Sequence, residues 1–126
     1  MHNPKRSPLI KFEYFYRDAS NYKAYGHVLL EGNLSAKERD EIISRLEGES
    51  FFIAEQVQVP ALYETLYEFS GGPTASDHCW HEFVQLSEHT DSAGDGGVWG
   101  TTERLLSKFR SVRKWDLRLS PHIAIA

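Results

Sequence analysis

The chain has 126 residues, of which 40% are hydrophobic and 25% are charged, and this composition suits one folded domain with its own core. Its single cysteine, Cys79, excludes an intrachain disulfide and all multi-cysteine zinc or iron–sulfur sites. A net charge of −4 argues against general nucleic-acid binding, and the absence of an 18-residue apolar stretch argues against a membrane partner. We therefore expect a cytoplasmic protein forming one domain over residues 1–126, with loosely ordered tails at 1–8 and 120–126.

The first predicted element is a β-hairpin over residues 9–31. The segment LIKFEYFYR (9–17) alternates apolar and polar residues, which is typical of a half-buried strand. Residues 18–21 supply turn chemistry, and the alternation resumes in YKAYGHVLLE (22–31).

A helix is predicted next, because Ser35 and Glu38 have the spacing of a capping box and an apolar stripe follows. Gly48 is its predicted end. The segment FFIAEQVQV (51–59) is predicted to begin as a short strand and to continue as an irregular approach to Pro60. A compact helix is predicted over residues 61–69.

The second half of the chain adds a strand over residues 79–86, a polar glycine-rich loop and a last helix. Thr101 or Thr102 can cap this helix, in which an apolar stripe is expected to be buried. That stripe comprises Leu105, Leu106, Phe109 and Val112. A final short edge strand over residues 116–119 is an open alternative.

The order of elements is thus β-β-α-β-α-β-α, with or without a final short β-strand. Consecutive strands joined by a short turn favour an antiparallel sheet. We expect an α+β two-layer sandwich, with a mainly antiparallel sheet and about three helices packed on one face.

The run DHCWHE (77–82) concentrates residues that bind metals. A strand would place Cys79 and His81 on one face, and His78 with Trp80 and Glu82 on the other. Zinc accepts cysteine and histidine ligands, but a catalytic site needs a third protein ligand. The candidates for that ligand are Asp77, His27, His89 and His122.

No known catalytic template is complete in this run. In HEFVQ (81–85), Gln85 occupies the place of the second histidine of the metalloprotease motif. Cys79 could act as a nucleophile activated by His81 or His78, although a lone cysteine among aromatic residues is more often a small core residue. Structural packing is the preferred interpretation, and zinc bound by Cys79, His81, His78 and Asp77 is the alternative.

The glycine-rich stretch GDGGVWGTT (94–102) lacks the lysine of a phosphate-binding loop, so a loop leading into a capped helix is expected. Within it, Trp99 either anchors the loop or contacts a partner. Charge is uneven along the chain: residues 1–88 carry net −6 and residues 89–126 net +2. The basic residues of the last helix explain this difference in part, and they offer a nucleic-acid contact as an alternative function: Arg104, Lys108, Arg110, Arg113 and Lys114.

The tip of the predicted hairpin, FYRDASNYK (15–23), is rich in hydrogen-bonding side chains. It is either ordinary turn chemistry or a recognition loop on a rigid hairpin. The segments FYRDASNYKAYG and GGPTASDHCWHEF are similar to small, uncharacterised bacterial proteins. This resemblance extends over about two-thirds of the chain and implies no activity.

The leading functional hypothesis is a small non-enzymatic binding module: a protein inhibitor, an immunity-type protein or an accessory protein whose partner is another protein. Exposed aromatic and arginine side chains are the usual energetic centres of binding surfaces. The candidate contact residues are Arg17, Asp18, Asn21, Tyr25, His27 and Trp99. The alternatives are a metal-dependent hydrolase or nuclease using residues 77–82, and nucleic-acid contact through the last helix.

Overall fold

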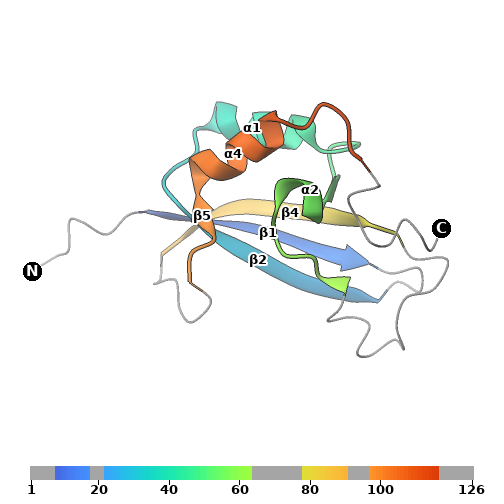
Figure 1. Ribbon diagram of the computed structural model, residues 1–126. Helices are drawn as coiled ribbons and strands as arrows, with labels where there is room; N and C mark the ends of the chain where they lie inside the picture. Colours follow the sequence, from blue (N-terminus) through green and yellow to red (C-terminus); the bar gives the residue numbers. More distant parts are fainter. Residues whose placement is uncertain (1–7, 18–21, 64–77, 91–96, 117–126) are drawn as a thin grey trace, which may run out of the picture.

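The structure, a computed structural model, describes residues 8–17, 22–63, 78–90 and 97–116. These residues form an α+β fold with three helices and a mixed, curled sheet of five strands in the order β3-β4-β1-β2-β5 (Figure 1). The strands are β1 (Leu9–Arg17), β2 (Lys23–Glu31), β3 (Phe51–Ile53), β4 (Trp80–His89) and β5 (Gly100–Thr101). The helices are α1 (Ala36–Arg45), α2 (Ala54–Val57) and α4 (Thr102–Arg110).

The predicted hairpin is confirmed. Strands β1 and β2 pair antiparallel in one unbroken register, from Leu9 opposite Glu31 to Arg17 opposite Lys23. In β1 the buried and half-buried side chains alternate along all nine residues, as the period of two predicted. The sequence pattern was sufficient here because one face of the hairpin is buried and the other is not.

Strand β4 pairs with both β1 and β3, and it extends to His89, three residues beyond the predicted end at residue 86. Its register shifts by one residue beside β1, where Glu13 faces Gln85 but Tyr14 faces Phe83. The extra residue is Val84, which is exposed. This bulge breaks the alternation of apolar residues, which explains why the end of the strand was predicted too early.

The short strand predicted at the start of residues 51–59 is confirmed, but the irregular structure predicted after it is wrong. Only Phe51–Ile53 is extended, and the chain then forms the short helix α2, which ends at Gln58 in a left-handed conformation with φ of 64°. The apolar residues of this segment, Ala54 and Val57, are spaced three apart and are both fully buried on the helix. A short apolar run of this kind fits either period, so packing decided between strand and helix.

The sequence did not predict β5, which pairs parallel to β2 over only two residues and makes the sheet mixed. The predicted helix over 61–69 falls mostly outside the described residues. The same holds for the final strand over 116–119 and for most of the tails over 1–8 and 120–126.

The N-terminal caps of α1 and α4 are as predicted, but α1 ends at Arg45 with Leu46 as its C-cap, before the predicted end at Gly48. Ser35 accepts a hydrogen bond from the backbone N–H of Glu38, whose carboxylate accepts one from the N–H of Ser35. Thr101 caps α4 by accepting from the N–H of Arg104. The predicted stripe is buried at each position: Leu105, Leu106 and Phe109 on α4, and Val112 just beyond its end at Arg110.

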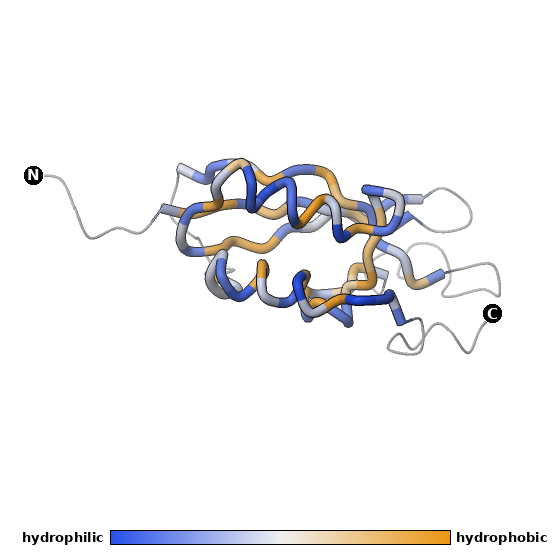
Figure 2. The backbone as a smooth tube through the Cα atoms, turned by 90° about the horizontal axis from the view of Figure 1, so that it is seen from above, coloured by the Kyte–Doolittle hydropathy of each residue, from blue (hydrophilic) through white to orange (hydrophobic). Residues whose placement is uncertain are grey.

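The core lies between the helices and one face of the sheet. Figure 1 shows the helices gathered on the same side of the strands, and Figure 2 shows hydrophobic residues recurring along both. Aromatic rings dominate this core, with Phe12 contacting Tyr14, Phe52 and Phe109 at centroid distances of 5.5–6.1 Å. No helix in the described part of the chain is long and apolar enough to cross a membrane.

Candidate functional site

The opposite face of the sheet carries no helix among the described residues, and we call it the outer face. It is defined by the side chains of β1, β2 and β4 that are out of phase with the buried ones. They include Lys11, Glu13, Phe15, Arg17, Lys23, Tyr25, His27, Glu82 and Gln85, whereas Leu29, in the same phase of β2, is buried.

An aromatic pair forms the centre of the outer face near the hairpin tip. Phe15 and Tyr25 are directly opposed across β1 and β2, with ring centroids 5.2 Å apart. Tyr25 is 69% exposed, which makes it the most exposed large side chain among the described hydrophobic residues. Cations flank the pair, because the Arg17 guanidinium lies 5.4 Å and the Lys23 ammonium 6.0 Å from the centre of the Phe15 ring.

Acidic and amide side chains from β4 complete the surface. The Nε of Arg17 donates to Glu82 Oε2 at 3.1 Å, and the amide of Gln85 donates to Glu13 at 2.7 Å. Exposed ion pairs of this kind contribute at most about 1 kcal/mol to stability. The pair instead orients the guanidinium beside the ring, so Arg17 is positioned before any partner arrives.

The structure brings together three of the six predicted contact residues: Arg17, Tyr25 and His27 share the outer face. Asp18 and Asn21 lie outside the described residues. Trp99 does not join this surface.

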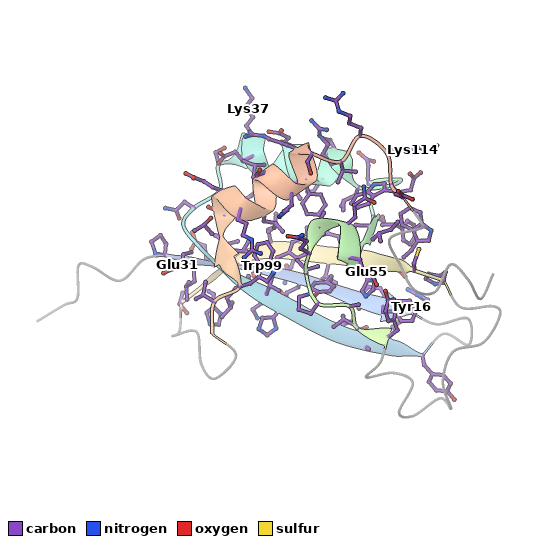
Figure 3. All side chains as sticks on the ribbon, in the orientation of Figure 1. Tyr16, Glu31, Lys37, Glu55, Trp99 and Lys114 are labelled. Atoms are coloured by element: carbon purple, nitrogen blue, oxygen red, sulfur yellow. The ribbon has the colours of Figure 1, made fainter. Side chains whose placement is uncertain are left out.

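Trp99 is instead held at the junction of β5 with the helices (Figure 3). Its indole N–H donates to the carbonyl of Gln58 at 2.9 Å, and the guanidinium of Arg104 lies 4.3 Å above its ring. Its backbone N–H donates to the carbonyl of Leu29 at 2.9 Å. These contacts fit a Trp99 that anchors its loop, rather than one that contacts a partner.

The predicted contact residues did not include Phe15 and Glu82. Phe15 carried a signal, because it is an aromatic residue out of phase with the apolar face of its own strand. Glu82 carried no such signal in the sequence. It lies 65 residues from Arg17 in the chain, and only the pairing of β1 with β4 brings the two side chains together.

Within the run DHCWHE, the predicted pair on one face of the strand, Cys79 and His81, packs in the core. Cys79 is 5% exposed and His81 is wholly buried. The His81 ring lies among Tyr16, Tyr63 and Phe52, with centroid distances of 5.2–5.9 Å. The histidine therefore occupies an aromatic cage in the core.

Both ring nitrogens of His81 face the backbone. The N–H of Leu62 donates to His81 Nε2 at 3.0 Å, and Nδ1 lies 3.4 Å from the carbonyl of Cys79. The Nε2 lone pair that would coordinate a metal is thus already an acceptor, which requires the tautomer protonated on Nδ1. His78 likewise accepts from the N–H of Trp80 through Nδ1.

The structure does not bring His27 or His89 to Cys79 and His81. His27 lies on the outer face of β2, and His89 lies at the opposite end of β4. Asp77 and His122 are outside the described residues. Within the four described segments, no three histidine, cysteine, aspartate or glutamate side chains are grouped as metal ligands.

Contacts within the fold engage part of the basic surface of the last helix. Arg110 donates two hydrogen bonds to Glu41 of α1, at 2.7 and 2.9 Å, and this pairing holds the pKa of the Glu41 carboxyl below its ordinary value. Arg104 covers the Trp99 ring.

Two further cations line a groove where α1 and α4 end. The groove has a volume of about 560 Å3, and Arg113 and Lys114 line it together with the rings of Trp80 and Trp115. Lys114 lies on the helix side of the molecule, away from the outer face (Figure 3). The groove combines positive charge with two aromatic rings.

No protein-family model, curated protein or solved structure shows significant similarity to this chain.

Proposed function

We propose that this chain is a small non-enzymatic binding module, of the inhibitor, immunity or accessory type, and that it contacts a partner protein through the outer face. The observation that carries the proposal is the Phe15–Tyr25 pair, a pair of aromatic rings on a sheet face that no described helix covers. Tyrosine and arginine beside a rigid platform are typical of binding hot spots. The paired strands fix this platform before binding, which lowers the entropy lost on association.

Charge on the outer face favours a protein surface over a polyanion. Lys11, Arg17 and Lys23 are interleaved with the carboxylates of Glu13 and Glu82. Phosphate backbones would meet these carboxylates at close range, whereas a protein surface of mixed charge can complement both signs. We therefore expect a partner with its own exposed apolar residue, surrounded by charges of both signs.

Affinity purification with matched variants tests this choice of surface. We expect wild-type protein to retain a partner from a lysate of the source organism, and Arg17→Ala and Tyr25→Ala each to weaken its binding by about 2 kcal/mol, near thirtyfold. The affinity for the identified and purified partner is then measured by titration calorimetry. Lys37→Ala on α1 is the control, because Lys37 is exposed on the helix side of the molecule (Figure 3). Equal affinity of all three variants would place the contact elsewhere.

A second candidate function is contact with single-stranded nucleic acid at the groove of Arg113 and Lys114. The observation in its favour is the arrangement of two indole rings, Trp80 and Trp115, beside these cations. Stacking rings and cations together are typical of single-strand binding. A labelled oligonucleotide whose affinity falls steeply with salt, and falls further in Trp115→Ala, would support this function. Salt-independent binding would remove it.

The hydrolase or nuclease hypothesis has less support. It uses His78 and His81 as metal ligands or general bases, yet the N–H of Leu62 already donates to His81 Nε2. Elemental analysis of the purified protein tests it directly. Stoichiometric zinc that is lost in His81→Ala but retained in His89→Ala would reverse the ranking of these proposals.

A further inference from the structure

The hydrogen-bonding direction of β2 can be read from two contacts. Gly32 N–H donates to the carbonyl of Pro8, so the pairs of even-numbered residues in this register are the hydrogen-bonded ones. Antiparallel strands alternate hydrogen-bonded and non-hydrogen-bonded pairs. The odd-numbered residues of β2 must therefore direct their N–H and C=O groups away from β1. The carbonyl of Leu29 confirms this, because it accepts from the N–H of Trp99 on the far side.

The edge of β2 is consequently open over five residues in the described part of the chain. Strand β5 pairs only with Leu30 and Glu31, and Trp99 satisfies the carbonyl of Leu29. Towards the hairpin tip, Lys23, Tyr25 and His27 present N–H and C=O groups to which no described strand pairs. Such an edge is a template for another extended strand.

We propose that a second copy of this chain occupies the edge, with its β2 antiparallel to the first and the twofold axis passing through Tyr25. The open stretch 23–27 is centred on this residue, so the pairing uses all of it. Lys23 then faces His27 of the second copy, and each hydrogen-bonded pair exchanges two hydrogen bonds. A register shifted by two residues, with the axis at Gly26, would oppose Lys23 to Leu29, whose carbonyl Trp99 already engages.

The side chains along the edge fit this self-pairing. On the outer face, the two Tyr25 rings meet as a cross-strand aromatic pair, and Tyr25 is 69% exposed in the single chain. On the core face, Ala24 and Gly26 face each other across the axis and project no large side chain towards the second copy, while Leu62 of the same chain already packs over Gly26. The two outer faces join into one continuous sheet, so the dimer doubles the binding surface proposed above.

A strand pair of this length falls short of the interface of roughly 1,200 Å2 that a stable complex buries. We therefore expect a reversible dimer whose population rises with protein concentration. Sedimentation velocity over a wide concentration range should show the weight-average mass rising from that of one 14.4 kDa chain towards twice that value. A constant monomer mass would overturn the proposal.

Cysteine cross-linking tests the register. In a Cys79→Ser background, Tyr25→Cys lies on the twofold axis, where opposed Cα atoms are close enough for a disulfide. We expect mild oxidation to link this variant into dimers at least roughly tenfold faster than Lys23→Cys, which lies on the same edge but faces residue 27. Gln85→Cys on β4 serves as a control for random collision, since it is exposed but distant from the edge. Equal rates for the three variants would exclude this register.

Proline tests the role of the backbone. The N–H of His27 points away from β1, so His27→Pro removes an edge donor and keeps the hairpin ladder intact. We expect it to weaken dimerisation by more than about tenfold with an unchanged circular dichroism spectrum. If His27→Pro fails to fold, Tyr25→Lys tests the same point by opposing two like charges on the axis. A dimer that persists in a folded variant would contradict the proposal.

Dimerisation and partner binding are separable. Arg17→Ala removes a side chain of the outer face that the strand pairing does not use. The proposed function predicts that this variant loses the partner, and the proposed dimer predicts that its sedimentation is unchanged.

Discussion

Tyr14 is a buried polar residue of β1 whose hydroxyl joins the sheet to the segment that follows α2. Its phenol is almost wholly buried and donates to the carbonyl of Pro60 at 2.6 Å, and burial raises its pKa well above the ordinary value near 10. A raised pKa means that the folded state favours the neutral phenol. The contribution of Tyr14 to stability is therefore complete below about pH 10 and is lost as the pH rises further.

We predict that the free energy of unfolding of the wild-type protein falls above about pH 10 more steeply than that of Tyr14→Phe. At neutral pH the variant should be about 1 kcal/mol less stable, because it lacks the hydrogen bond to Pro60. Urea denaturation at several pH values measures both effects. Tyr22→Phe is the matched control, since Tyr22 is 60% exposed, and parallel curves for the wild type and Tyr14→Phe would contradict the prediction.

Glu55 on α2 carries a partly buried carboxylate whose charged form destabilises the folded state. One carboxylate oxygen, Oε1, is buried without a hydrogen-bond partner, and burial raises the pKa of this carboxyl. The folded state therefore favours the protonated acid, and the destabilising effect appears as the pH rises through the raised pKa.

We predict that Glu55→Gln stabilises the protein at neutral pH by up to about 1 kcal/mol, since the half-exposed position limits the effect. The gain should shrink as the pH falls and the wild-type carboxyl becomes protonated. Thermal unfolding at neutral and acidic pH measures the difference. An equal gain at both pH values would show that ionisation is not its cause.

At the scale of the elements, Gly32 decides how β2 turns into α1. It adopts a positive φ of 116°, and a Cβ there would lie 2.6 Å from the hydroxyl of Thr102 at the start of α4. Gly48, after α1, also has a positive φ, of 58°, but a Cβ there would meet nothing within 4 Å. A side chain at either glycine would strain the backbone, but only a side chain at Gly32 would also clash with Thr102.

We predict that Gly48→Ala costs about 1 kcal/mol, the strain of a left-handed residue, and that Gly32→Ala costs at least about 2 kcal/mol because the contact with Thr102 adds to the strain. Chemical denaturation of both variants measures the two costs. Equal costs would mean that Thr102 moves aside without loss.

Predictability from sequence also differed between elements. The hairpin and helices α1 and α4 were predicted because each carries its own periodicity or caps over nine or more residues. The short strand at the start of segment 51–59 was predicted, and its pairing with β4 extends only as far as Ile53. Helix α2 was missed because its four residues are too few to show a helical period. Strand β5 is two residues long, too short for any local signal.

For the whole molecule, the fold separates the surface proposed for binding from the core that stabilises it. The helices and the aromatic core lie on one face of the sheet, and Arg17 and Tyr25 lie on the other. Residues of the surface proposed for binding can therefore be substituted without loss of the fold.

We predict that Arg17→Ala and Tyr25→Ala each change the free energy of unfolding by less than about 1 kcal/mol. Phe52→Ala in the core should cost about 3–5 kcal/mol. Urea denaturation at a protein concentration low enough to exclude self-association measures all three. A large loss of stability in Arg17→Ala would show that the ion pair with Glu82 contributes to folding as well as to the surface.

The sequence by itself determined the α+β class, the first hairpin with its buried face, the two capped helices and the absence of an intrachain disulfide. These features depend on neighbours within a few residues, where period, capping and composition act directly. Only the tertiary structure decided the roles of His81, Trp99 and Glu82. Each role depends on a contact with a residue far along the chain: Leu62 for His81, Gln58 for Trp99 and Arg17 for Glu82. Such contacts follow from strand order and register, which no local pattern encodes.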